Sequence, residues 1–375
     1  MKNLKLAPQD QKKLDQLFVN LKIESSHFIG YPCNLGFDYT ELHPFLNLGI
    51  NNVGDPFVSS NYHVNSHVLE REVVEYFAQL THAKDNYWGY VTNGGTEGNM
   101  YGLYLARELH PQGVVYYSQD THYSIAKILR ILRMKNIMIR SQDNGEIDYE
   151  DLEETIRIKR HVTPIIVANI GTTMKGAIDN VPKIQGILKK LAMPTQYIHC
   201  DAALSGMILP FVEDAPAFGF DSGTDSIAIS GHKFIGSPIP CGIAIAKKEN
   251  VDRIARAIEY VGSLDTTLTG SRNGITPIFL WYALKTRGPE HFKLMVQQCF
   301  DIADYAISEL KRIGQTAWRN PFSTTVVFDY PSIDIINKWQ LASYQDIAHL
   351  IVMPHVTKEW VNRFIADLAQ EGNQP

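Results

Sequence analysis

The chain has 375 residues, of which 45% are hydrophobic and 20% charged, and its formal net charge is −5. This composition is typical of a globular protein with one large domain and a smaller attached one, and the scattered basic residues exclude the positive stripe of a nucleic-acid-binding protein. No apolar run approaches the roughly 20 residues that span a bilayer, and the N-terminus lacks the apolar core of a signal peptide. We therefore expect a cytoplasmic protein that binds neither nucleic acid nor membrane.

The four cysteines lie far apart in the sequence, at Cys33, Cys200, Cys241 and Cys299. They form no CxxC pair and no zinc-ligand spacing, so the sequence predicts no metal site. Buried free thiols are the expected state, because disulfides are rare in the cytoplasm.

The N-terminal part of the chain, residues 1–65, is predicted to form a helix followed by an irregular segment. Apolar residues recur at helical spacing within residues 8–23, at Leu14, Leu17, Phe18 and Leu21. Such a stripe usually packs on a neighbour, often another subunit, and the opposite face is not rich enough in Lys and Arg for a membrane-surface helix. Residues 30–65 are rich in Gly, Pro and Asn, which indicates an ordered but irregular segment.

Between residues 68 and 248, predicted strands alternate with predicted helices. The strand-like runs are Gly89–Thr92, Val114–Ser118, Ile137–Ser141, Pro164–Gly171, Tyr197–Ala203, Asp225–Ser230 and Cys241–Lys247. The predicted helices are 68–81, 96–109, 122–133, 148–160 and 181–191. This alternation predicts an α/β domain, residues 66–287, with a mostly parallel seven-stranded sheet covered by helices on both faces.

The last part of the chain, residues 288–375, is predicted to form a small α+β domain. A long helical stretch follows residue 288, then strand-like runs at Thr325–Tyr330 and Ile347–Met353, and then a closing helix at 357–369.

Three loops at predicted strand ends carry residues suited to react or to bind a ligand. Parallel sheets bind ligands at this edge. The first loop, Thr92–Asn99, joins a strand to a helix, and its glycines and free helix amides suit a phosphate group. A tight turn with Thr96 as a helix cap explains this loop equally well.

The second loop begins at Asp201, whose burial at the end of an apolar strand is costly without a cationic partner such as a protonated pyridine nitrogen. The alternative is a carboxylate that caps the next turn.

The third loop, Ser230–Phe234, places Lys233 just past another strand. A lysine there can form a Schiff base with an aldehyde cofactor, although a lone lysine is usually an exposed surface residue. A strand-end aspartate followed 32 residues later by Ser-x-His-Lys is much harder to explain as coincidence. His122 also follows a strand, and its ring is predicted either to stack on a pyridine ring or to be a structural histidine.

These residues resemble the group II pyridoxal-phosphate-dependent amino-acid decarboxylases, and within that family the bacterial histidine decarboxylases most closely. The resemblance extends over nearly the whole chain and is carried by Phe37–Thr40, Tyr90–Asn99, Asn169–Thr173, Asp201–Gly206, Ser230–Lys233, Thr269–Gly274 and Thr324–Phe328. It implies a fold type I enzyme that binds pyridoxal 5'-phosphate and acts as a homodimer with active sites at the subunit interface.

The resemblance also implies a role for each site residue. Lys233 carries the internal aldimine, Asp201 pairs with the pyridine nitrogen, His122 stacks on one ring face and Ala203 packs on the other. Gly95, Thr96, Ser230 and His232 are implied as phosphate ligands, and Thr172 lies near the ring hydroxyl. By the same analogy, Gly270, Ser271 and Arg272 reach a phosphate in the partner subunit, and Tyr62 helps to form the substrate pocket.

The substrate implied by the resemblance is L-histidine, converted to histamine and carbon dioxide. Plant serine decarboxylases share almost every motif, but the short N-terminus and the match around Tyr62 favour histidine. Ser323 falls where histidine decarboxylases contact the imidazole, although the serine enzymes have a serine nearby too. Animal relatives return the proton from a Tyr on a mobile loop, whereas here Val261–Leu268 is short and lacks one. The proton donor is therefore left open between Tyr260 and His122.

Other functional classes explain the sequence less well. A dehydrogenase needs GxGxxG and a later acidic residue, a cysteine desulfurase needs a cysteine on a mobile loop, and neither pattern is found here. An aminotransferase usually binds the substrate carboxylate with an Arg in the small domain, for which Arg319 is the nearest candidate. A non-catalytic binding protein leaves the pairing of Lys233 with Asp201 unexplained.

Overall fold

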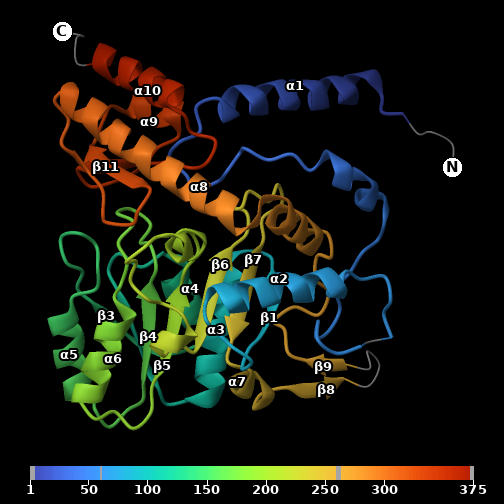
Figure 1. Ribbon diagram of the computed structural model, residues 1–375, viewed down its shortest axis with the longest axis vertical. Coiled ribbons are helices and arrows are strands. Elements are labelled where there is room, and N and C mark those ends of the chain that lie inside the picture. Colours follow the sequence, from blue (N-terminus) through green and yellow to red (C-terminus); the bar gives the residue numbers. More distant parts are fainter. Residues whose placement is uncertain (1–4, 60, 259–262, 372–375) are drawn as a thin grey trace.

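A computed structural model gives the structure of the protein and describes residues 5–59, 61–258 and 263–371. A seven-stranded sheet forms the centre of the larger unit, a four-stranded sheet lies in the smaller unit, and helix α8 (Thr276–Arg312) runs between them (Figure 1). Among the described residues, no helix combines the length and apolar character needed to cross a membrane.

The large sheet is mostly parallel, as the sequence predicts. Its strands, in spatial order, are β1 (Trp88–Thr92), β7 (Gly242–Ala246), β6 (Ser226–Ser230), β5 (Tyr197–Asp201), β4 (Pro164–Asn169), β2 (Val114–Ser118) and β3 (Lys135–Ile139). Only β7 runs antiparallel to its neighbours. The carboxyl ends of β1, β2, β4, β5 and β6 therefore meet at one edge, and each is followed by a loop with predicted site residues.

Helices cover both faces of this sheet, which explains why its central strands are apolar on both sides. One face packs against α3 (Gly95–Leu109), α4 (Ser124–Ile131) and α7 (Lys248–Asp252). The other face packs against α2 (His67–Leu80), α5 (Tyr149–Ile158), α6 (Val181–Lys190) and α8. Asp148 and Asn180 cap α5 and α6 through their side chains, so these two helices begin where the sequence provides a cap.

Short elements connect these helices and strands. They are the 3-10 helices η1 (Thr40–Asn47), η2 (Ser205–Met207), η3 (Leu209–Phe211) and η4 (Phe220–Ser222), and the hairpin of β8 (Arg256–Ile258) and β9 (Ser263–Asp265). Tyr260 and the start of the Val261–Leu268 segment lie outside the described residues.

The small unit contains an antiparallel sheet ordered β10 (Ala317–Trp318), β11 (Thr325–Asp329), β13 (Ile347–Ile351) and β12 (Ala342–Tyr344), with helices α9 (Ile333–Trp339) and α10 (Lys358–Glu371). The sequence predicts β11, β13 and α10 but misses β10, β12 and α9. The domain boundary that we propose at 287/288 coincides with a kink in α8, where Gly288 has a φ of 68° and Pro289 follows. Only glycine adopts this φ without strain, so the kink has a local cause.

Helix α1 (Pro8–Ser25) has no buried residue and extends beside the rest of the molecule (Figure 1). Its predicted apolar stripe is solvent-exposed, with exposed fractions of 51% at Leu14, 53% at Leu17, 60% at Phe18 and 55% at Leu21. The helix is confirmed, but within one chain the stripe has no partner among the described residues. This feature bears on the oligomeric state.

A buried ion pair between Arg272 and Glu70 joins α2 to the loop before α8. The two side chains are 1% and 0% exposed. The Glu70 carboxylate also accepts hydrogen bonds from Asn52 Nδ2 at 2.6 Å and from the Val91 amide at 2.9 Å. Arg272 is therefore committed within its own chain and does not extend toward a partner subunit as the family analogy implies.

Replacing Glu70 with Ala should lower the free energy of unfolding by about 3–5 kcal/mol, because it leaves the buried Arg272 charge without its counter-charge. Urea denaturation followed by circular dichroism measures the change. Asp252→Ala, which breaks the exposed Lys248–Asp252 pair, is the control and should leave the unfolding midpoint unchanged. Equal midpoints for Glu70→Ala and Asp252→Ala would contradict this assignment.

Candidate active site

Lys233 lies three residues past the end of β6, in a partly buried position. Burial lowers the pKa of its amine below the ordinary value, and the nearby Asp201 and Cys33 oppose this shift. Within the described part of the chain, Nζ of Lys233 makes no hydrogen bond or salt bridge. This lysine is thus not the exposed surface residue of the alternative interpretation but an enclosed amine available for reaction.

Asp201 ends β5 and is 7% exposed. Its Oδ2 accepts a hydrogen bond of 2.7 Å from Asn99 Nδ2, and its Oδ1 accepts one of 3.2 Å from the Ala203 amide. The bond from the Ala203 amide is the turn cap that the alternative interpretation expects. Turn capping therefore accounts for only one of the two carboxylate oxygens. The Asp201 carboxylate also lies near two ionisable groups, since it raises the pKa values of both Lys233 and His122.

His122 lies in the loop between β2 and α4, as the sequence predicts. Its Nδ1 accepts a hydrogen bond from the Ser124 amide at 3.3 Å and lies 2.8 Å from Ser124 Oγ. Burial lowers the pKa of the imidazole, Asp201 raises it, and Lys233 lowers it further. The structure therefore brings His122, Asp201 and Lys233 into one electrostatic cluster, although they come from three different strands.

The N-terminus of α3 faces Ser230 and Ala203. A Cβ added at Gly95 would lie 2.7 Å from Ser230 Oγ and 3.6 Å from the Ala203 Cβ, so only glycine leaves this space open. Helix α3 begins after Gly94 with no side-chain cap, which makes the predicted Thr96 cap wrong and leaves the first helix amides for a ligand. An uncapped helix N-terminus lined by a serine suits an anion such as phosphate.

Two further predicted residues lie in loops at the same edge. His232 Nδ1 is 2.8 Å from the Cys241 carbonyl oxygen, and burial lowers the pKa of its ring. Thr172 is 4% exposed, and its Oγ1 accepts a hydrogen bond of 3.0 Å from the Ala177 amide. Because a hydroxyl both accepts and donates, the Thr172 proton is still free to be donated to another group.

Tyr62 and Ser271 differ from these residues because both are exposed. Asn51 connects their loops: its amide donates to the Val64 carbonyl at 3.0 Å and its Nδ2 donates to Ser271 Oγ at 3.2 Å. Exposed positions of this kind suit contacts with a second subunit better than contacts within one chain.

Ser323 is 2% exposed and accepts a hydrogen bond of 3.1 Å from the Thr325 amide. Its Oγ packs against Gly176, where an added Cβ would lie at 2.0 Å. Gly176 belongs to the loop that carries Thr172, since its amide donates to the Thr172 carbonyl at 2.8 Å. Arg319, the candidate of an aminotransferase, instead pairs with Asp304 at 2.7 Å.

Sequence reasoning missed Asn99 and Cys33. Asn99 is 2% exposed and binds Asp201 directly, and Cys33 is close enough to Lys233 to change the pKa of that amine. Asn99 could have been found from the sequence because it is a polar residue on the buried face of α3, one turn after Thr96.

In the described parts of the chain, no three His, Cys, Asp or Glu side chains lie close enough together to bind a metal ion, and all four cysteines are free thiols.

A strand-end lysine and a buried carboxylate at the edge of a mostly parallel seven-stranded sheet define a fold type I enzyme that uses an aldehyde cofactor. Comparison with known proteins gives the family. Residues 65–330 match the pyridoxal-dependent decarboxylase conserved domain. The chain belongs to the pyridoxal-dependent decarboxylase family.

Relatives match over nearly the full length. Histidine decarboxylase of Mesorhizobium japonicum is 49% identical over 97% of this chain and 99% of its own, and that of Morganella morganii is 50% identical over 98% of each. The crystal structure of L-methionine decarboxylase from Streptomyces sp. 590 superposes with a TM-score of 0.90 at 26% identity, covering 98% of this chain and 95% of its own.

The residues at the edge fit the cofactor of this family, pyridoxal 5'-phosphate. The enclosed Lys233 amine suits its aldehyde, and the buried Asp201 carboxylate suits its ring nitrogen. The open space at Gly95 and the uncapped amides of α3 suit its phosphate. The aldehyde, the ring nitrogen and the phosphate of the cofactor are therefore each compatible with a group at this edge.

Covalent attachment of pyridoxal 5'-phosphate to the apoenzyme should proceed at lower pH than attachment to an ordinary lysine. Only the neutral amine attacks an aldehyde, and the lowered pKa of Lys233 makes the neutral form abundant at lower pH. The attachment rate, measured from peptides reduced with borohydride, should rise with pH and level off below 10.5, the ordinary lysine value. Lys233→Ala gives the background. A rate that follows the profile of free N-acetyllysine would refute the expectation.

Proposed function

We propose that this chain decarboxylates L-histidine to histamine and carbon dioxide, with pyridoxal 5'-phosphate attached to Lys233. The observation that carries the proposal is the enclosed Lys233 amine, with its lowered pKa, next to the buried Asp201 carboxylate. Histidine is favoured as the substrate because relatives named histidine decarboxylase are 49% and 50% identical over 97% and 98% of the chain.

Pyridoxal 5'-phosphate, when bound, supplies a ring that accepts the electrons of the bond to the departing carboxylate. Asp201 would hold a proton on the ring nitrogen, because a buried carboxylate stabilises a neighbouring positive charge. His122 would stack on one face of the ring and Ala203 would pack on the other. Thr172 would donate its free hydroxyl proton to the ring hydroxyl.

The phosphate would be held by the uncapped amides of α3 at Gly95 and Thr96, by Ser230 and by His232. Ser230 Oγ lies at the space that the missing Gly95 side chain leaves open. This arrangement fixes the ring, and a fixed ring lets the protein choose which bond of the substrate breaks.

The substrate would be selected by Ser323 and Tyr62. Ser323 lies against the loop that carries Thr172, and its hydroxyl proton is free because Oγ accepts from the Thr325 amide. A free hydroxyl donor suits an imidazole nitrogen, which accepts hydrogen bonds when neutral. Tyr62 is exposed and would act across a subunit boundary.

The first test is amine release from a panel of amino acids with pyridoxal phosphate added. Histidine should give histamine, and Lys233→Ala should lower the rate by at least about 10³-fold because the attachment site is lost. Ser323→Ala, an isosteric change, should raise the KM for histidine by about tenfold. Ethanolamine from serine would overturn the substrate, and no amine from any amino acid would overturn the reaction.

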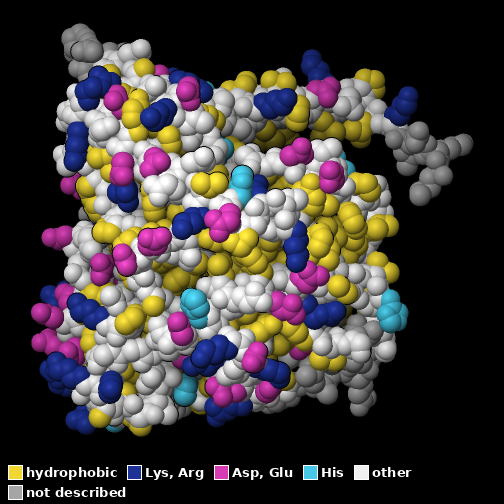
Figure 2. Space-filling view, in the orientation of Figure 1, with side chains coloured by type: hydrophobic (Ala, Val, Ile, Leu, Met, Phe, Trp, Pro, Cys, Tyr) yellow, Lys and Arg dark blue, Asp and Glu magenta, His cyan; other side chains and the backbone are white. Residues whose placement is uncertain are grey.

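We also propose that the active enzyme is a cytoplasmic homodimer with shared sites. Three observations support a dimer: the uncovered apolar stripe of α1, the exposure of Tyr62 and Ser271, and further exposed apolar residues at Tyr31, Phe45, Leu46 and Leu48. Figure 2 shows hydrophobic side chains gathered on the face below α1. Free thiols at all four cysteines agree with a reducing compartment.

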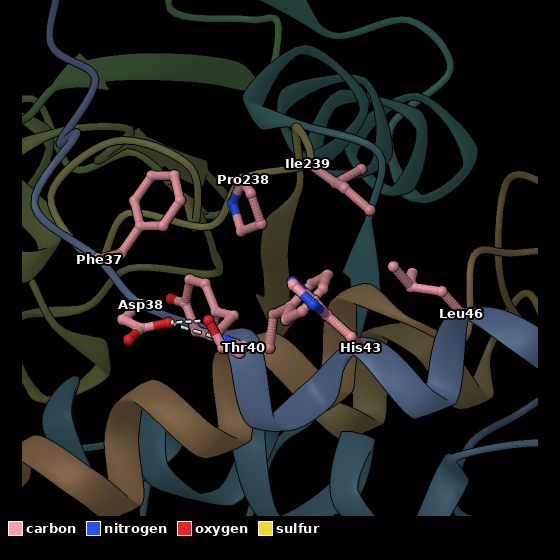
Figure 3. Close-up of a pocket in the computed structure, with 9 residues that line it drawn as sticks. Phe37, Asp38, Thr40, His43, Leu46, Pro238 and Ile239 are labelled. Atoms are coloured by element: carbon pink, nitrogen blue, oxygen red, sulfur yellow. Dashed lines mark hydrogen bonds between the residues drawn. The ribbon is translucent and has the colours of Figure 1, made fainter.

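A cavity of about 380 Å³ opens on this side of the molecule, and Leu46 belongs both to its wall and to the exposed apolar set (Figure 3). Its lining is Phe37, Asp38, Tyr39, Thr40, His43, Leu46, Pro238, Ile239 and Phe279. Within the wall, Asp38 accepts hydrogen bonds from the Thr40 amide at 2.9 Å and from its hydroxyl at 2.6 Å. None of the predicted site residues lines the cavity.

Deleting residues 1–23 should weaken the dimer, because the deletion removes the apolar stripe of α1. The double change Leu17→Glu and Leu21→Glu should do the same without shortening the chain. Lys12→Glu with Gln16→Glu, on the opposite side of the same helix, is the matched control and should leave the dimer intact. Sedimentation velocity over a dilution series measures the dissociation constant. An unchanged dimer in both the deletion and the Leu17/Leu21 variant would contradict the assignment.

A further inference from the structure

Behind Asp201 lies a row of buried polar side chains that the proposed chemistry does not use. Tyr197 and His199 come from β5, Ser226 from β6 and Asn99 from α3. Their exposed fractions are 1%, 0%, 1% and 2%. Buried polar groups of this kind lower stability unless they are paired, so their pairing is informative.

The four side chains form a continuous chain of hydrogen bonds that ends at the carboxylate. Tyr197 OH donates to Ser226 Oγ at 2.9 Å, and Ser226 Oγ lies 2.8 Å from His199 Nδ1. On the other side of the ring, His199 Nε2 lies 2.9 Å from Asn99 Oδ1. Asn99 Nδ2 then donates to Asp201 Oδ2 at 2.7 Å.

The donors in this chain follow one direction. A carboxylate only accepts, so Asn99 must turn its NH2 group to Asp201 and its oxygen to His199. His199 Nε2 must therefore carry a proton and donate it, which leaves Nδ1 as the acceptor for the Ser226 hydroxyl. Bonds aligned in this way polarise one another, and every donor in the row points toward Asp201.

The imidazole is also fixed in space. A Cβ added at Gly102 of α3 would lie 2.2 Å from His199 Nδ1 and 2.7 Å from Ser226 Oγ, so the helix approaches the ring as closely as glycine allows. Burial lowers the pKa of His199 to about 4, which keeps the ring neutral near pH 7 and preserves the acceptor at Nδ1. Close packing against α3 and burial therefore favour one orientation and the neutral form of the ring.

We propose that His199 is a positioning residue for the cofactor: by donating from Nε2 it fixes the Asn99 amide, and Asn99 in turn holds the Asp201 carboxylate toward the ring nitrogen. Without His199, the Asn99 amide could rotate by half a turn and bring its oxygen against Asp201 Oδ2. The carboxylate would then lose one of its two hydrogen bonds. This inference rests on the cofactor assigned above.

The test is a graded series of variants along the row. His199→Leu should weaken pyridoxal phosphate binding by about tenfold or more, the value of one hydrogen bond to a charged group. His199→Gln keeps a donor and should recover part of the loss. Ser226→Ala, a small change that the fold should tolerate, should have a weaker effect in the same direction, and Tyr197→Phe the weakest. The dissociation constant and the pH dependence of the cofactor's visible absorption are measured for each.

A double-mutant cycle separates positioning from general stability. If His199 acts through Asn99, adding His199→Leu to Asn99→Ala should cause no further loss of cofactor affinity. Thermal unfolding of each apoenzyme is recorded in parallel. Losses that add in the double variant, or a lower melting temperature with unchanged cofactor affinity and absorption, would overturn the proposal. Because cofactor binding is the readout, failure to produce histamine would refute the proposed reaction and not this inference.

Discussion

Ionisable groups are costly to remove from water, and the candidate site brings three of them together in buried or partly buried positions. The Asp201 carboxylate, the Lys233 amine and the His122 ring meet at one edge because the parallel strands β5, β6 and β2 all end there. Burial lowers the pKa values of both Lys233 and His122, and the nearby Asp201 opposes each shift. The parallel sheet is therefore what creates the site: an antiparallel order would send alternate strand ends to opposite edges.

The same constraint explains the surroundings of these groups. A buried carboxylate requires hydrogen-bond donors. Asp201 accepts one hydrogen bond from the following turn and one from helix α3. The donor in α3 needs its own partner, and that need extends the polar row across β5 and β6 to Tyr197. Polar residues in the middle of an apolar core are thus a consequence of placing one charge at its edge.

Much of this arrangement could be predicted from the sequence. Short β-rich runs located all seven strands of the large sheet, although β3 begins two residues before the predicted run. A residue just past a strand end has its position set by the sheet. Short elements escaped prediction because β10, β12 and α9 are too brief to show a period. The alternative Thr96 cap was wrong because α3 begins at Gly95, with Gly94 at the N-cap, so Thr96 lies inside the first turn. Asn99 and His199 were missed because their contact joins residues 100 positions apart.

Helix α1 has 18 residues and buries none of them in its own chain. A helix of this length has little stability in water when nothing packs against it, because forming its first hydrogen-bonded turn is unfavourable in free energy. If a second chain covers its stripe, the coil-to-helix equilibrium of residues 8–25 becomes linked to protein concentration by mass action. The N-terminus would then act as a local reporter of assembly, with slow amide hydrogen exchange in concentrated solution and fast exchange on dilution.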